Sequence, residues 1–134
     1  MASNADVTRR FLRAWIDNDV AVLDELGDPD LIDHNPAPGQ SPDWAGFKQT
    51  IAGYKMVFPD FDYDLHAVIA EGDLVASHWT AHGTHQGELF GVPPTGNKVS
   101  LEGINIYRIK DGRVCEVWTQ ADQMALLQQI GAMG

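Results

Sequence analysis

Residues 103–120 read GINIYRIKDGRVCEVWTQ, and this stretch decides the fold. Two apolar-rich segments flank the pair Asp111-Gly112. An Asp-Gly pair is typical of the two-residue turn of a β-hairpin, because both of its residues tolerate the positive φ that such a turn requires. We therefore predict two long antiparallel strands, over about 98–109 and 113–120.

The same turn predicts a register for the hairpin. If Lys110 pairs with Arg113, counting outward sets Asn105 opposite Trp118. Because side chains alternate between the faces of a strand, one face then carries a polar set. This set is Asn105, Trp118, Gln120 and, if the strand geometry continues, Asp122.

Two further strands precede the hairpin. From Phe61 onward apolar residues alternate with polar ones up to about residue 70, which is the period of a half-buried strand. Gly72-Asp73 predicts a tight turn into a second strand over about 74–84. The four strands follow one another in sequence, so we expect an antiparallel meander.

The N-terminal part of the chain has helical periodicity. We expect one helix from Ser3 as N-cap to Asp17, a shorter one from Asp19 to Leu26, and a third from Asp43 to Phe58. Between them, residues 31–36 read as a short extended segment ended by a proline. Residues 122–130 return to a helical pattern. Helices followed by a meander predict an α+β fold, with three N-terminal helices packed on the concave side of a curved, cone-shaped sheet.

Length and composition favour a single globular domain over residues 1–134. Nine Lys and Arg against nineteen Asp and Glu give a formal charge of -10, so nucleic acid and anionic membranes are unfavourable partners. The lone Cys115 cannot form an internal disulfide, and no leader or membrane-spanning run is evident, so we expect a cytoplasmic protein.

A curved sheet closed by helices predicts a cavity for a small, largely apolar molecule. Asn105, Gln120 and the Trp118 indole can donate hydrogen bonds to a carbonyl or enolate oxygen, and Asp122 could exchange a proton with the ligand. The alternative is that Asp122 only caps the terminal helix, because Asp is a favoured N-cap. The two interpretations are compatible.

Other candidates are weaker. Pro36 restricts the chain beside His34 and Asn35, which makes both residues candidate site residues. His82 lies in the predicted second strand and could face the cavity, although a structural histidine is the simpler interpretation. No histidine spacing predicts a metal site. The aromatic residues that could form cavity walls, or simply core, are Trp15, Tyr54, Phe58, Trp79 and Trp118. The loop over residues 86–97 is a candidate rim.

Both faces of the predicted hairpin are apolar. An open sheet in a monomer does not need an apolar outer face, so we expect the sheets of two copies to associate into a homodimer or a homotetramer.

Several short motifs occur in order along the chain. They are His34-Asn35-Pro36, Phe58-Pro59-Asp60-Phe61, Gly83-Thr84-His85, residues 91–96 (GVPPTG), and Asp122-Gln123 followed by residues 126–131 (LLQQIG). In this arrangement the chain resembles the SnoaL-like polyketide cyclases, a branch of the nuclear transport factor 2-like superfamily, from Val7 to Gly131.

The resemblance implies the cone-shaped, cystatin-like fold, association through the sheet, and acid-base catalysis without a cofactor. It implies ring closure of a polyketide-like ester by intramolecular aldol condensation. Asp122 matches the aspartate that acts there as acid and base, and Asn35 matches an asparagine that assists. Asn105 takes the place of the family's histidine, and an amide cannot carry a proton at neutral pH.

Two other functions fit the same features. One is an isomerase or hydratase of ketosteroid-isomerase type acting on a steroid-like or terpenoid ring. The other is a dimeric module that binds a small molecule without catalysis, since one fold serves many functions.

Overall fold

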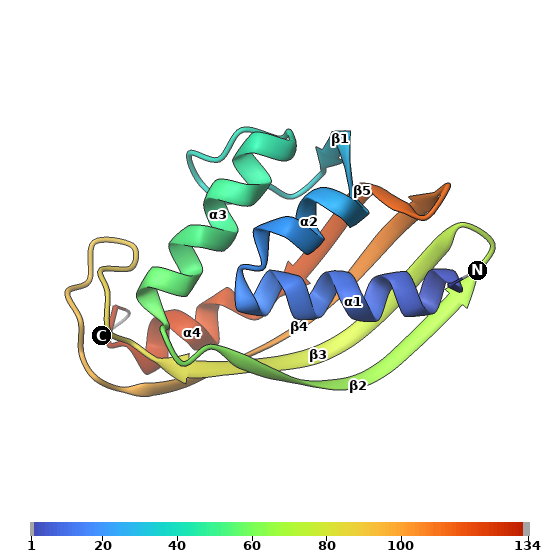
Figure 1. Cartoon of the computed structure of the whole chain (residues 1–134). Coiled ribbons are helices and arrows are strands. Elements are labelled where there is room, and N and C mark those ends of the chain that lie inside the picture. The colour runs from blue at the N-terminus through green and yellow to red at the C-terminus, as the bar shows by residue number, and fades with distance from the viewer. Residues whose placement is uncertain (1, 133–134) are drawn as a thin grey trace.

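The computed structural model describes residues 2–132, and Figure 1 shows helices lying across one face of a long, curved sheet. The elements are α1 (Asn4–Asp17), α2 (Val20–Leu26), β1 (Gly27–Asp33), α3 (Trp44–Val57), β2 (Asp62–Glu71), β3 (Leu74–Thr84), β4 (Lys98–Lys110), β5 (Arg113–Ala121) and α4 (Gln123–Gln129). The predicted α+β class is confirmed. Within residues 2–132, no helix is both long and apolar enough to cross a membrane.

Side-chain caps start the N-terminal helices where the sequence predicts. The hydroxyl of Ser3 accepts a hydrogen bond from the backbone N–H of Asp6 at 3.1 Å. Asp19 and Asp43 cap α2 and α3 in the same manner. Each cap satisfies a backbone N–H that has no partner within its own helix.

The sheet contains a fifth strand. Its order is β1-β5-β4-β3-β2, in which β2 to β5 form the predicted antiparallel meander and β1 runs parallel to β5. The sheet is therefore mixed. Asp33, the last residue of β1, pairs with Val117. The sequence indicates an extended segment here but not its partner, because a parallel pair has no connecting turn to mark it.

A bulge in β5 changes the predicted register of the hairpin. Lys110 pairs with Arg113 as expected, but the register shifts between Arg108 and Ile109. Beyond that shift Asn105 lies opposite Thr119, and Ile106 lies opposite Trp118. The predicted pairing of Asn105 with Trp118 is therefore wrong by one residue, because a bulge adds a residue to one strand only. Trp118 and Asn105 consequently lie on opposite faces.

The helices pack against the concave face of the sheet in two apolar regions. In the larger one, the Phe11 ring meets Tyr107 edge-on at 5.3 Å between centroids and stacks on Phe47 at 5.9 Å. The smaller one lies beneath α4 and contains Val57, Phe58, Val99, Leu126 and Ile130.

Gly103 leaves room for an aromatic ring on the concave face. It pairs with Trp79 of β3, and a Cβ at this position would overlap the indole. We predict that Gly103→Ala lowers the free energy of unfolding by about 1–3 kcal/mol, the usual effect of overpacking. Urea unfolding measures the change.

Gly53→Ala is the matched control for this prediction. Gly53 lies in α3, and a Cβ there meets no atom within 4 Å. Alanine is the better helix former, so the control should be neutral or stabilising by up to about 1 kcal/mol. Equal losses for the two variants would contradict the role of Gly103.

Candidate functional site

A cavity of about 760 Å³ lies between the helices and the concave face of the sheet. Its volume suits a small organic molecule. α1, α3, α4 and all five strands contribute walls, together with the loop after β1. Most of the lining is apolar or aromatic. The aromatic lining residues are Trp15, Phe47, Tyr54, Phe61, Tyr63, Trp79, Phe90 and Tyr107.

One wall carries a buried amide. Asn105 on β4 is only 4% exposed. Its Oδ1 accepts a hydrogen bond from the Ser77 hydroxyl, and its Nδ2 donates to the Tyr107 hydroxyl at 3.1 Å. These contacts hold the amide beside Thr119, the cavity-lining residue opposite it on β5.

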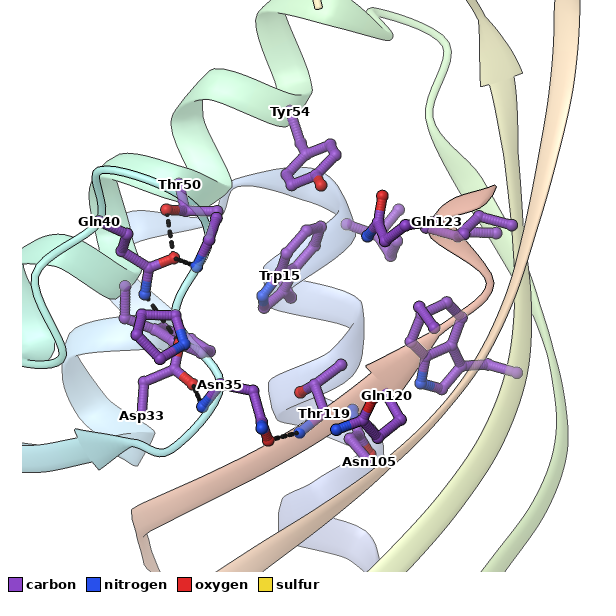
Figure 2. A pocket seen from close by; sticks show the side chains of 18 of the residues that line it. Trp15, Asp33, Asn35, Gln40, Thr50, Tyr54, Asn105, Thr119, Gln120 and Gln123 are labelled. Carbon is purple, nitrogen blue, oxygen red and sulfur yellow. Dashed lines mark hydrogen bonds between the residues drawn. The ribbon is translucent and has the colours of Figure 1, made fainter. Parts of the chain in front are cut away.

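Asn35 joins the loop after β1 to this wall. Its Oδ1 accepts a hydrogen bond from the backbone N–H of Thr119 at 2.9 Å, as Figure 2 shows. The bond occupies the acceptor atom and leaves the Nδ2 hydrogens available to a ligand. Asn35 is therefore held in position while keeping donor capacity.

A carboxylate lies on the same side of the cavity. Asp33 is 7% exposed, and its two oxygens accept from the Asn35 backbone N–H at 3.0 Å and from Gln40 Nε2 at 2.7 Å. Gln40 is itself held by the Thr50 hydroxyl, which donates to Oε1 at 2.7 Å. Figure 2 shows this chain of hydrogen bonds from α3 to the end of β1.

The tyrosines of the cavity are hydrogen-bond donors at neutral pH. Burial raises the pKa of the Tyr54 hydroxyl, and a hydrogen bond with Gln123 offsets part of the rise. Burial also raises the pKa of Tyr63 and of Tyr107. A phenol with an ordinary pKa near 10 is already protonated at pH 7, so these shifts keep it neutral.

Trp79 presents a donor without a protein partner. Its ring lines the cavity, and its Nε1 is buried with no hydrogen-bond acceptor among residues 2–132. Buried indole N–H groups usually have a partner. A ligand oxygen would supply one.

Six of the predicted site residues line the cavity. They are Asn35 and Asn105 on the polar side, Gln120 at the exposed rim, and the aromatic residues Trp15, Tyr54 and Trp79. The predicted loop rim contributes Phe90, which is 49% exposed.

Five predicted residues are not part of the cavity lining, and one of them, Asp122, is described below. Trp118 is on the outer face, where His34 stacks on its indole at 4.5 Å with an interplanar angle of 7°. Phe58 is buried in the apolar cluster beneath α4. His82 is exposed, with Nε2 3.8 Å from an Asp64 oxygen. The outer position of Trp118 follows from the bulge in β5.

Asp122 caps α4. Its Oδ1 accepts from the Ala125 backbone N–H at 3.1 Å, so the capping interpretation is confirmed. Its side chain is exposed and is not among the cavity-lining residues, although its neighbours Ala121 and Gln123 are.

The sequence interpretation missed Asp33, Gln40 and Thr119. Asp33 had a signal, because strand alternation places it on the same face as the apolar Leu31. Thr119 was hidden by the bulge. Gln40 lies in a proline- and glycine-containing loop, where no periodicity indicates which way a side chain points.

The chain is similar to known polyketide cyclases. A family model described as SnoaL-like polyketide cyclase matches residues 5–130. The chain is 29% identical to aklanonic acid methyl ester cyclase DauD of Streptomyces sp. (strain C5), over 98% of this chain and 83% of the relative. It is 30% identical to nogalonic acid methyl ester cyclase of Streptomyces nogalater, over 81% of this chain and 83% of the relative.

Solved structures are similar over the whole chain. IdmH from Streptomyces antibioticus superposes with a TM-score of 0.86 at 33% identity, covering 97% of this chain and 99% of IdmH. TsrD from Streptomyces laurentii gives a TM-score of 0.87 at 25% identity, covering 99% of each chain.

Replacing the buried amide tests the polar wall. In Asn105→Ala the buried hydroxyls of Ser77 and Tyr107 lose their partner. We expect a loss of about 1–3 kcal/mol in the free energy of unfolding, measured in urea. Gln120→Ala removes an exposed amide from the rim of the same cavity and should change stability by less than about 0.5 kcal/mol. Similar losses for both would contradict the assignment.

Proposed function

The chain belongs to the SnoaL-like polyketide cyclase family, and from this premise we propose that it closes a ring in a polyketide-like ester by an intramolecular aldol-type addition. The observation that carries the proposal is the cavity, which combines aromatic walls with a few polar groups on one side. Such a cavity can fold a flexible substrate and orient its carbonyl groups. The reaction needs no cofactor.

The proposed reaction moves one proton twice. A base removes a proton from a carbon whose C–H bond is made acidic by flanking carbonyl groups. The resulting enolate carbon then bonds to a second carbonyl carbon. The alkoxide that forms then takes a proton back. Holding the two carbons within about 3–3.5 Å supplies a large part of the rate, because the bound substrate has already lost its conformational freedom.

Neutral donors would stabilise the developing oxyanion. Within residues 2–132, the Nδ2 hydrogens of Asn35 and the Nε1 of Trp79 have no hydrogen-bond partner, and the half-buried Tyr54 hydroxyl stays protonated. Donors placed before the reaction stabilise the charge strongly in a cavity that excludes water. Asn105, in the place of the family's histidine, fits this role because an amide can hold an oxyanion without exchanging a proton.

The group that moves the proton must be a carboxylate within reach of the substrate. The family resemblance implies that this carboxylate belongs to Asp122. To reach the cavity, its side chain would have to leave the N-terminus of α4, where it accepts from Ala125. Asp122 is therefore one of two carboxylates to test, and the other is on the cavity wall.

The substrates of the relatives are the first compounds to test. We expect the protein to convert aklanonic acid methyl ester or nogalonic acid methyl ester into a product of unchanged mass that contains a new ring. Chromatography with mass detection and NMR of the product measure this. Conversion of a β,γ-unsaturated ketone without any ring closure would favour the isomerase alternative, and binding without conversion would contradict catalysis.

Filling the cavity should block this reaction. Ala121 lines the cavity, so Ala121→Phe should reduce kcat/KM at least about tenfold by excluding substrate. Ala70→Phe places the same ring at an exposed position of β2 that does not line the cavity, and it serves as the control. Equal rates for both variants would place the reaction elsewhere.

The outer face of the sheet fits a second copy of the chain. A row of paired residues crosses the outer face from β2 to β5: Ile69, Ala76, Ile106 and Trp118. Ile69 is 67% exposed. Ile104, two residues from Ile106 on β4, is 51% exposed. Apolar surface in such a continuous row favours association, and a two-fold axis would pair the row with itself.

A charge on this face should disrupt the proposed dimer. We expect Ile104→Lys to shift the chain from dimer to monomer in sedimentation velocity, because a lysine cannot be buried there without a partner. Val20→Lys is the control, since Val20 is equally exposed but lies on α2. A monomeric wild-type chain would contradict the proposal.

A further inference from the structure

Asp33 is the only residue with a carboxylate among the described residues that line the cavity. The same lining contains no lysine, arginine, histidine or cysteine. Tyrosine hydroxyls are the other ionisable groups there, and burial keeps them protonated. Among the described lining residues, Asp33 is therefore the one side chain that can accept a proton from a bound substrate at neutral pH.

We infer that Asp33 is the catalytic carboxylate of this cavity, which accepts the proton from the substrate carbon and returns it to the alkoxide. The inference rests on the proposed function and names a residue that the resemblance does not.

The hydrogen bonds of Asp33 suit the role of a proton acceptor. Oδ1 and Oδ2 each accept one hydrogen bond, from the Asn35 backbone N–H and from Gln40 Nε2. An ionised carboxylate has about four lone-pair sites, so each oxygen can accept a further proton. The backbone N–H of Asp33 donates to the Pro42 carbonyl at 2.9 Å, which holds the end of β1 in place. The carboxylate is thus positioned but not saturated.

A purely structural role explains less of this environment. The bond to the Asn35 N–H is a local turn contact that an asparagine could also make. Burying a charge costs free energy, and the described cavity lining holds no Lys, Arg or His to offset that cost. Other turn-forming or capping carboxylates of this chain, those of Asp43, Asp60 and Asp122, are exposed. A turn or a cap therefore does not explain why this position carries a buried carboxylate, whereas proton transfer does.

Asp33 also lies with the proposed oxyanion donors. Asn35 follows it by two residues and bonds to Thr119 on β5, which pairs with Asn105. Figure 2 shows Asp33, Asn35, Thr119 and Asn105 along one side of the cavity. Asp122 does not line the cavity and does not lie in this group.

The step balances without a co-reactant. The Asp33 carboxylate takes the proton, and the electron pair of the broken C–H bond becomes the enolate. That pair forms the new C–C bond, while the carbonyl π electrons move to oxygen as an alkoxide. The Asp33 carboxylic acid then protonates the alkoxide, which restores the carboxylate.

The test compares amide substitutions of three carboxylates in the full chain, with aklanonic acid methyl ester as the probe. Asp33→Asn should lower kcat about 100-fold or more, the usual effect of losing a general base. Binding, followed by fluorescence of the cavity tryptophans, should change little. Asp43→Asn is the matched control and should keep wild-type turnover, because Asn also caps a helix. Loss of turnover in Asp122→Asn but not in Asp33→Asn would overturn the inference.

A second variant keeps the test valid if Asp33→Asn does not fold. In the double variant D33N/Q40E the carboxylate and the amide exchange places, so every hydrogen bond between positions 33, 40 and 50 keeps a donor and an acceptor. The carboxylate is then displaced, and a displacement of even 1 Å can cost about 100-fold in rate. Wild-type turnover in the folded double variant would overturn the role of Asp33.

Deuterium uptake separates this inference from the proposed function. In D₂O the wild type should exchange the acidic hydrogen of the unreacted ester faster than the enzyme-free control, and Asp33→Asn should not. Exchange that depends on Asp33, without ring closure, would support the inference and contradict the cyclase proposal. If both ring closure and exchange persist in Asp33→Asn, the result would support the cyclase proposal and contradict the role of Asp33. Neither exchange nor ring closure in the wild type would contradict both.

Discussion

The parallel pairing of β1 with β5 is the interaction on which the site depends. It brings Asp33 beside Val117 and continues as the His34 backbone N–H bonds to the Val117 carbonyl at 2.9 Å. The following loop is then held against β5 by Asn35. Without this pairing the polar residues after β1 would have no fixed position relative to the meander, and the cavity would lose one side.

The cavity exists because the helices pack tightly against the sheet only at its two ends. Phe11 and its aromatic neighbours fill one end, and the cluster beneath α4 fills the other. Between them, large rings such as Trp15 and Trp79 form walls without filling the space. An unfilled apolar space costs stability, so the two packed ends must compensate for it. Tertiary packing thus creates the cavity and also supplies the stability that offsets it.

The bulge in β5 separates the two faces of the sheet. It moves Trp118 outward, where the indole stacks with His34 next to the exposed isoleucines, and it turns Thr119 toward the cavity. One inserted residue therefore reverses which of these two neighbouring positions faces the cavity. The same shift explains why Asn105 faces the cavity with Thr119 as its partner.

The sequence by itself determined the helices, their caps and the four meander strands, because caps, turns and periodicity act between residues close in the chain. It also indicated Asn35, Asn105 and several aromatic walls. Only the tertiary structure decided the partner of β1, the bulge and the cavity positions of Asp33, Gln40 and Thr119. Those features depend on contacts between residues far apart in sequence, such as Asn35 with Thr119, and local patterns carry no record of such contacts.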